Sequence, residues 1–313
     1  MSEEYNEHVP VMLEEVLQYS NLKNNSVVID MTLGRCGHSK AFLNSIPSGH
    51  LYGVDRDSKA ITYAEGELKK YKNVDILKAK FSEAPLLLNQ NYGLEKADFI
   101  FYDLGVSSPQ FDDPSRGFSY RYDSPLDMRM DQIENRLTAK EVVNSYEPST
   151  LVKAIFEYAD EIYAKQIVRN IVKHRKQKPI ETTFELVEII KEALPKSVLY
   201  KDKHPAKKTF LAIRYLVNQE KDEILFGIPE GIRMLDKGGR LEVLTFNSYE
   251  DGLVKKIFKQ FTSILTSSKY LPPENKSIDY KLVTKKPLEP SLEEIERNKR
   301  AKPAKLRIIE RIK

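Results

Sequence analysis

The stretch A-D-F-I-F-Y-D-L-G-V-S-S-P-Q-F, residues 97–111, decides the fold. Its first half, Phe99 to Leu104, is a run of aromatic and aliphatic side chains that is typical of a buried strand. Its second half contains Gly105 and Ser107, turn formers that do not extend a central strand. Asp103 stands where strand gives way to loop. Ligands of open α/β sheets bind beyond the carboxyl ends of the strands, so this stretch predicts a site, although a strand with a plain surface turn has the same pattern.

Strands of the same kind precede this stretch, and helical patterns separate them. This alternation predicts βαβ units and a parallel, doubly wound sheet. The earlier strands are Val27–Asp30, His50–Asp57 and Val74–Phe81, and the earlier helices are Val9–Leu17, Ser39–Ser45 and Ser58–Tyr71. The same pattern resumes late in the chain after a turn at Gly238 and Gly239. Its elements there are the strand Arg240–Phe246, the helix Glu250–Phe261, the strand Ile278–Thr284, the helix Glu293–Lys299 and the strand Leu306–Ile312.

The middle of the chain has a different pattern. A long loop rich in aromatic and charged residues, Asp112–Asp131, is followed by apolar residues at helical spacing and by no evident strand. We expect an α/β domain over residues 1–111 and 209–313, interrupted by an all-α domain over residues 112–208. The expected helices are Thr150–His174, Phe184–Leu194 with a capping box at Thr182 and Glu185, and a third from Pro205 to Phe226.

Composition bounds the class of protein. The 313 residues are 41% hydrophobic and 31% charged, which is typical of a soluble globular chain. No apolar run is long enough to span a bilayer and no secretory signal is evident, so a cytoplasmic protein with no membrane partner is expected. Cys36 is the single cysteine, which excludes an intrachain disulfide and a cysteine-based zinc site. No metal site is expected.

The net charge of +4 is modest, but the basic residues are clustered. The clusters are His174–Lys178, Lys201–Lys208 and Arg297–Arg307. Such clusters suit a phosphate backbone, and solvated helix ends and a solvated tail explain them equally well.

The loop from Asp30 to Ser39 joins a strand to a helix start, where free N–H groups favour an anionic ligand group. Its glycines do not have the G-x-G-x-x-G spacing of dinucleotide-binding proteins, which disfavours a nicotinamide cofactor. Asp55 ends the next strand, where an acid accepts hydrogen bonds from ribose hydroxyls. Asp57 is a competitor that helix capping explains better. A nucleoside cofactor that bears a carboxylate, such as S-adenosylmethionine, fits this order.

These residues resemble a known family, the bacterial small-subunit rRNA cytosine-N4 methyltransferases, also called the RsmH (MraW) family. The resemblance extends over most of the chain. The matching segments are H-V-P-V-M-L around Val9, D-M-T-L-G-R-C-G-H-S from Asp30, G-V-D-R-D from Gly53, D-L-G-V-S-S-P-Q-F from Asp103, R-G-F-S-Y from Arg116, S-P-L-D-M-R-M-D from Ser124, H-P-A-K-K-T-F from His204 and G-G-R-L from Gly238.

The resemblance implies a class I S-adenosylmethionine-dependent methyltransferase fold, Rossmann-like, with an inserted helical domain that recognises RNA. The implied activity is N4-methylation of a cytosine in the decoding region of small-subunit (16S) rRNA, in an assembled or late-assembling 30S subunit. A homodimer is left open. The implied cofactor contacts are Cys36, Gly37, His38, Asp55, Phe81, Asp103 and Gln110.

The segment from Ser108 to Phe111 is similar to the S-P-P-[Y/F/W] motif of amino methyltransferases. By this analogy, Ser108 and the carbonyl groups near Pro109 accept hydrogen bonds from the cytosine amine, and Phe111 stacks on the base. The target base must leave its stack to react. Residues available to bind the RNA are Arg116, Phe118, Tyr120, Arg121 and Tyr122, unless the loop is simply folded on its own aromatic residues.

The chain departs from the family pattern at three positions: Cys36 replaces a glycine, Leu211 a glutamine and Asn247 a histidine. The departures at Leu211 and Asn247 keep open a ribosome-assembly factor that binds the cofactor with little catalysis. A methyltransferase that acts on a small molecule is a further alternative, favoured by the modest net charge and disfavoured by the basic clusters.

Overall fold

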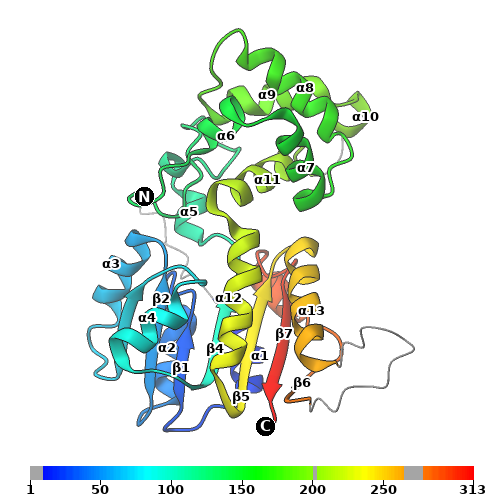
Figure 1. The fold of residues 1–313 in the computed structure, drawn as a ribbon. Helices are drawn as coiled ribbons and strands as arrows, with labels where there is room; N and C mark the ends of the chain where they lie inside the picture. Colours follow the sequence, from blue (N-terminus) through cyan, green and yellow to red (C-terminus); the bar gives the residue numbers. More distant parts are fainter. Residues whose placement is uncertain (1–9, 200–202, 264–277) are drawn as a thin grey trace. The chain divides into compact units, whose positions relative to one another are not determined.

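The computed structural model describes residues 10–199, 203–263 and 278–313, which form two compact units (Figure 1). One unit comprises residues 1–105 and 221–313, and the other comprises residues 106–220. The divisions therefore fall at 105/106 and 220/221 rather than at the expected 111/112 and 208/209. The reason is packing, because Phe111 and residues such as Phe210 and Val217 belong to the core of the helical unit.

The first unit contains a seven-stranded sheet in the order β3-β2-β1-β4-β5-β7-β6. The first five strands are parallel, whereas β7 is antiparallel to both β5 and β6. This is the class I methyltransferase arrangement expected from the sequence. The strands are β1 Val27–Asp30, β2 His50–Asp55, β3 Val74–Lys78, β4 Ala97–Asp103, β5 Leu235–Thr245, β6 Tyr280–Leu282 and β7 Lys305–Arg311.

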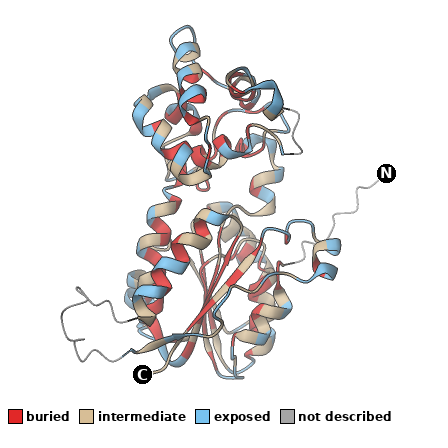
Figure 2. Ribbon diagram, turned by 90° about the vertical axis from the view of Figure 1, so that its right-hand side faces the viewer, coloured by how far each residue is buried: buried red, intermediate tan, exposed pale blue. Residues whose placement is uncertain are grey.

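Helices cover both faces of this sheet, which explains why its strands are buried apolar runs (Figure 2). Apolar residues of α1, α2 and α3 pack on one face, and those of α4, α12 and α13 pack on the other. The helices of this unit are α1 Leu13–Tyr19, α2 Gly37–Ser45, α3 Ser58–Glu67, α4 Ala84–Tyr92, α12 Glu220–Met234, α13 Ser248–Thr262 and α14 Leu292–Arg297.

Two expectations at the edges of this unit need correction. The expected turn at Gly238 and Gly239 lies inside β5, where a shift of register toward β4 and the positive φ of 82° at Gly238 accommodate the glycines. The first helix begins at Leu13 rather than directly after Pro10, because Met12 has a left-handed backbone. Val9, expected on that helix, lies outside the described residues.

The second unit is helical and has its own apolar core. The expected capping box at Thr182 is confirmed: its side chain accepts from the Glu185 N–H, and Glu185 accepts from the Thr182 N–H. The helices are α5 Ser108–Asp112, a 3-10 turn at Pro114–Arg116, α6 Ala139–Ser145, α7 Pro148–Ala159, α8 Ala164–Arg175, α9 Thr183–Ala193, α10 Lys196–Leu199 and α11 Lys207–Asn218.

The expected helix over residues 150–174 is wrong, because the structure has two helices that meet at Asp160. That residue has a φ of 49°, and the turn is held by Lys208 Nζ donating to its carbonyl oxygen at 2.5 Å. The next residue, Glu161, is buried and accepts from the Tyr163 N–H. The left-handed Asp160 and these contacts therefore end α7 and separate it from α8.

The expected helix from Pro205 to Phe226 is also two helices. Gln219 has a φ of 54° and separates α11 from α12. Arg214 holds this turn by donating from Nε and Nη2 to the two carboxylate oxygens of Glu220, at 2.8 and 2.7 Å.

Among the described residues, no helix combines the length and apolar character needed to cross a membrane.

Candidate functional site

The carboxyl ends of β1 and β4 lie side by side in the first unit, where the strand order changes direction. Asp30 ends β1 and is buried, with its carboxyl group accepting from Ser39 Oγ at 2.5 Å and from the Thr32 N–H at 3.0 Å. Thr32 Oγ1 in turn accepts from the N–H of Asp103, which ends β4, at 2.8 Å. The loop after β1 is thereby fixed at the crevice in which α/β sheets bind ligands.

Asp55 joins the loop after β1 to the loop after β2. Its Oδ2 accepts from the Gly34 N–H at 2.9 Å and its Oδ1 accepts from the Asp57 N–H at 2.8 Å. Burial raises the pKa of Asp55 to about 6. Asp57 caps α3 by accepting from the Lys59 N–H, so its expected role in capping is confirmed.

Cys36 and Gly37 form the start of α2. Cys36 has a φ of 60°, the left-handed conformation that glycine adopts freely and that costs other residues on the order of 1 kcal/mol. Burial and then the nearby Asp30 raise the pKa of its thiol to about 12, so the thiol stays protonated. A Cβ atom at Gly37 would lie 2.4 Å from Pro10 Cγ, which explains the glycine.

His38 connects α2 to the end of β4. Its Nε2 lies 3.0 Å from the carbonyl oxygen of Val11 and must carry a proton to donate there, which directs Nδ1 toward Asp103 Oδ2, 3.9 Å away. The imidazole also packs on the Phe101 ring, with 4.6 Å between centroids. This nearly buried ring is therefore a structural link as well as a candidate cofactor contact.

Three carboxyl groups influence one another at this crevice. Burial raises the pKa of Asp103 to about 7, with further contributions from Asp30 and Glu250, although its side chain is 28% exposed. Burial also raises the pKa of Asp30 to about 6, against the hydrogen bonds that it accepts. Such a cluster favours a ligand group with positive charge.

The neighbouring helix α13 explains one departure from the family pattern. Asn247 is its N-cap and accepts from the Glu250 N–H at 2.9 Å, while Glu250 accepts from the Phe246 N–H at 2.8 Å. Asparagine is among the best N-cap residues, so the replacement is compatible with an ordered helix start. The second departure, Leu211, is half-buried on α11.

Phe81 lies three residues beyond β3, not at the end of the strand as expected. Its ring meets Tyr102 edge to face at 5.2 Å between centroids, and its Cβ fills the space that a side chain at Gly227 would need. Its role against adenine stays a prediction.

The second unit holds the remaining predicted residues, beginning with α5. Gln110 is buried, and its Oε1 accepts from the Ser107 N–H at 3.0 Å in a capping box. The Pro109 carbonyl oxygen accepts from the Asp113 N–H at 3.0 Å. Phe111 packs against the helical core, and the Arg121 guanidinium lies 6.0 Å from its ring centroid. The Gln110 side chain and the Pro109 carbonyl oxygen, predicted to contact the cofactor and the cytosine amine, therefore form hydrogen bonds within the α5 turn.

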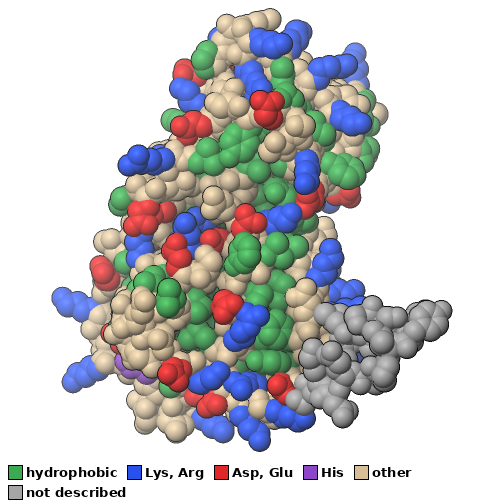
Figure 3. Space-filling view, viewed as in Figure 1, with side chains coloured by type: hydrophobic (Ala, Val, Ile, Leu, Met, Phe, Trp, Pro, Cys, Tyr) green, Lys and Arg blue, Asp and Glu red, His purple; other side chains and the backbone are tan. Residues whose placement is uncertain are grey.

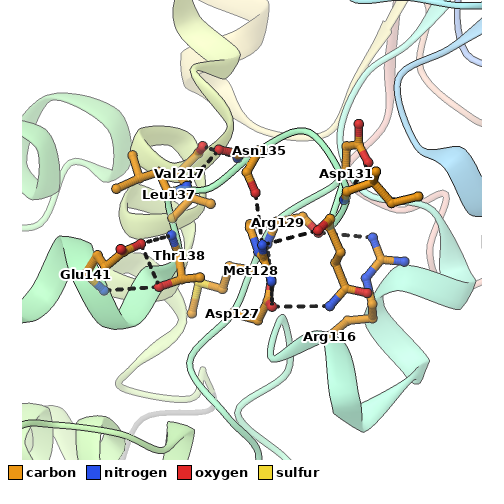
Figure 4. Close-up of polar contacts among 12 residues, drawn as sticks. Arg116, Asp127, Met128, Arg129, Asp131, Asn135, Leu137, Thr138, Glu141 and Val217 are labelled. Carbon is orange, nitrogen blue, oxygen red and sulfur yellow. Dashed lines mark hydrogen bonds and ion pairs between the residues drawn. The ribbon is translucent and has the colours of Figure 1, made fainter.

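The loop after α5 is largely folded into the helical core. Arg116 is 2% exposed and its Nη2 donates to the carbonyl oxygens of Arg129 and Met130, at 3.0 and 2.7 Å (Figure 4). Phe118 is 5% exposed in the same core. Direct contact of either residue with RNA would require the loop to rearrange, so their predicted roles are not supported by this conformation.

The segment P-L-D-M-R-M-D holds that loop in place. Arg129 donates from Nε and Nη2 to the two oxygens of Asp127, at 3.0 and 2.6 Å, and from Nη1 to the Asn135 carbonyl oxygen at 2.9 Å (Figure 4). Asp127 and Arg129 thus form a structural ion pair within this segment. Asp131 accepts from the Ile133 N–H and thereby orders the next turn.

Tyr120, Arg121 and Tyr122 are the predicted RNA contacts that reach the surface. Tyr120 and Arg121 line a pocket of about 600 Å³ together with Lys203, His204 and Lys207.

The predicted residues thus divide between the two units. The first unit gathers Asp55, Asp103 and the Cys36–His38 segment at one edge of the sheet, and the second holds Ser108 to Tyr120. Sequence reasoning did not assign roles to Asp30, Thr32 and Glu250, which organise the crevice. Asp30 could have been found, since it ends β1 as Asp103 ends β4.

Comparison with known proteins gives a consistent result. The model of the MraW methylase family matches residues 5–312. The chain is 44% identical over 310 residues to the ribosomal RNA small subunit methyltransferase H of Mesoplasma florum, with 97% of this chain and 99% of the relative covered. The proteins of the same name from Lactiplantibacillus plantarum and Mycoplasma capricolum are 44% and 43% identical, each with at least 97% of both chains covered.

Proposed function

We propose, from the premise that this chain belongs to the MraW methylase family, that it methylates the exocyclic N4 of a cytosine in the decoding region of small-subunit rRNA, with S-adenosylmethionine as the methyl donor. The observation that carries the proposal is the full-length identity of 44% to an rRNA small subunit methyltransferase, joined to the acids Asp30, Asp55 and Asp103 at the carboxyl ends of β1, β2 and β4.

The residues at the crevice fit S-adenosylmethionine. Asp55 stands at the end of β2, where it can accept from ribose hydroxyls, and the acids at the ends of β1 and β4 suit a cofactor with an ammonium and a sulfonium group. The Cys36–His38 segment forms the start of α2, whose positive dipole end favours a carboxylate. When bound, the cofactor supplies an electrophilic methyl group.

The residues of α5 would position the cytosine amine. The amine is a weak nucleophile because its lone pair is conjugated with the ring, and it loses a proton when the new C–N bond forms. Ser108 Oγ and the Pro109 carbonyl oxygen, through its second lone pair, can accept hydrogen bonds from the N–H groups of the amine. These bonds would direct the lone pair of the amine nitrogen out of the plane of the base. Phe111 would stack on the base. These roles rest on the similarity of motifs.

The helical unit would recognise the RNA, and we place the reaction on an assembled or late-assembling 30S subunit in the cytoplasm. Figure 3 shows Lys and Arg side chains across the face in view, interspersed with Asp and Glu. This mixed surface is consistent with binding a shaped ribonucleoprotein rather than with unspecific attraction to any polyanion.

Methyl transfer with purified components tests the proposal. The protein is given S-adenosylmethionine with a labelled methyl group and one of three substrates: 30S subunits that lack the modification, naked small-subunit rRNA, or free cytidine. We expect label in N4-methylcytidine of the RNA, with 30S subunits as the best substrate. Transfer to cytidine alone would favour a small-molecule enzyme, and cofactor binding without transfer would favour an assembly factor.

A further inference from the structure

The open pocket of about 600 Å³ lies entirely within the helical unit. One wall is an aromatic pair: the Tyr120 and His204 rings are stacked, 4.1 Å between centroids and 9° from parallel. Phe210 supports Tyr120 edge to face at 5.7 Å. The pair is therefore a rigid, flat surface facing a space within the range of small-ligand sites.

The rim of the pocket is cationic. Arg121, Lys203 and Lys207 are exposed, and the ion pairs formed among the described residues include none of the three. Other basic residues of this unit are paired with acids, as in Lys140–Glu181 and Lys178–Glu185, both at 2.6 Å. Three uncompensated cations around one concavity make it an anion site.

His204 contributes a ring rather than a charge. Burial, and then the charge of Lys191, lower the pKa of His204, so its imidazole is neutral at pH 7. Its Nδ1 also accepts from the Ala206 N–H at 3.3 Å, which fixes the ring plane. A neutral ring stacked on tyrosine is a surface on which a nucleobase can stack, and such stacking is worth about 1–3 kcal/mol per base.

We propose that this pocket binds a single-stranded nucleotide of the rRNA substrate other than the target cytosine, with its phosphate among Arg121, Lys203 and Lys207 and its base on the Tyr120–His204 pair. The inference rests on the proposed rRNA substrate and assigns a separate subsite to it. An acidic peptide would satisfy the cations but would leave the flat aromatic wall without a matching group, which is why RNA is the better occupant.

Binding measurements on the full-length protein test the phosphate contacts. The variant K203A/K207A is compared with K153A/K165A, which removes two exposed lysines from α7 and α8 of the same unit, outside the pocket. The dissociation constant for a decoding-region rRNA fragment is measured from 50 to 300 mM salt. We expect the slope of log affinity against log salt to fall by about 1.4 for the pocket variant, since each contact with single strands contributes about 0.7.

The control variant should keep the wild-type slope, and both variants should keep the wild-type affinity for S-adenosylmethionine and the wild-type Tm. Equal slopes for all three proteins would overturn the proposal. If wild type neither binds the fragment nor methylates 30S subunits, the rRNA function fails instead, so the two failures are distinguishable.

A second measurement tests the stacking surface. A fluorescent 2-aminopurine is placed at single-stranded positions around the target, and its quenching on binding is followed for wild type, H204A and H204F. We expect one position to be quenched by wild type and H204F, which keeps a flat ring, and at least tenfold weaker binding by H204A. Quenching that H204A leaves unchanged at every position would contradict a base on this pair. Competition by a poly-glutamate peptide as strong as by RNA of equal charge would point to an acidic protein partner and would also overturn the proposal.

Discussion

At the scale of single residues, Asp55 has two roles. It holds the loop after β1 by accepting backbone hydrogen bonds, and it is predicted to accept hydrogen bonds from the ribose hydroxyls of the cofactor. The ionised carboxylate is the better acceptor, and its pKa is raised to about 6. We expect the Kd for S-adenosylmethionine to rise as the pH falls from 7.5 to 5.5. Asp55→Asn should weaken binding roughly tenfold or more at pH 7.5, because an amide leaves one backbone N–H without an acceptor.

Calorimetric titrations across this pH range measure both effects. Asp57→Asn is the matched control, since asparagine preserves the cap of α3 and should keep nearly wild-type affinity. A larger loss in Asp57→Asn than in Asp55→Asn would contradict the assignment of Asp55.

Glu242 is a residue whose environment opposes its charge. It is fully buried on β5, opposite Phe101 and Ile308 in the neighbouring strands, and its two carboxyl oxygens have no hydrogen-bond partner among the described residues. Burial raises its pKa well above the ordinary value. We expect Glu242→Met, which fills a similar volume, to raise the free energy of unfolding at pH 7.5 by about 1–3 kcal/mol.

The sign of the pH dependence follows from the raised pKa. The protonated form folds more favourably, so the stability from Glu242 is present at low pH and is lost as the pH rises toward and through its folded pKa. The stability advantage of Glu242→Met should therefore shrink as the pH falls from 7.5 to 5.5. Urea denaturation of both proteins at each pH measures the difference, and an advantage that grows at low pH would refute the account.

Arg116 shows where prediction from single residues fails. Beside Phe118 and Tyr120 in sequence, it has the pattern of an RNA-binding loop. The structure buries it because the carbonyl groups that its guanidinium requires are supplied by Arg129 and Met130, brought near by the ion pair of Arg129. The residues next to Arg116 in the sequence do not indicate that the carbonyl groups of Arg129 and Met130 will accept from its guanidinium.

At the scale of elements, the strands were predictable because buried parallel strands are short, apolar and rich in β-branched and aromatic residues. Helix ends were less predictable. The breaks at Asp160 and Gln219 use left-handed residues other than glycine, and they are held by Lys208 and by the Arg214–Glu220 pair. The helices α4 and α6 were not predicted, although they have the same lengths as α2 and α1, which were.

Gly117 is an element-scale constraint that can be tested. It ends the 3-10 turn with a φ of 66°, and a Cβ atom there would lie 2.3 Å from the Pro125 carbonyl oxygen. Gly117→Ala should lose at least about 1–2 kcal/mol of stability from the left-handed backbone alone, with the clash in addition. Gly66→Ala, in α3 where a Cβ atom meets nothing within 4 Å, should gain about 0.5–1 kcal/mol. Thermal and urea unfolding of the two variants measure these opposite changes, and equal shifts would contradict the constraint.

At the scale of the whole molecule, the sequence predicted an interrupted α/β unit, because its strand pattern stops and resumes. It placed the divisions a few residues away from those observed, since no Gly- or Pro-rich linker marks them and the boundaries are set by packing of Phe111 and α11 into the helical core. The crevice was predictable from strand ends alone. The helical unit's pocket was not, because Tyr120 and His204 are distant in sequence.

The central claim is methylation of cytosine N4 in small-subunit rRNA, and mass spectrometry of that rRNA from cells with and without this protein tests it most directly. The rRNA is digested to fragments, and the decoding-region fragment is analysed for N4-methylated cytidine. We predict that one methyl group disappears from that fragment in the deletion strain and returns when the wild-type gene is restored, but returns incompletely with Asp55→Asn. An unchanged fragment in the deletion strain would contradict the account.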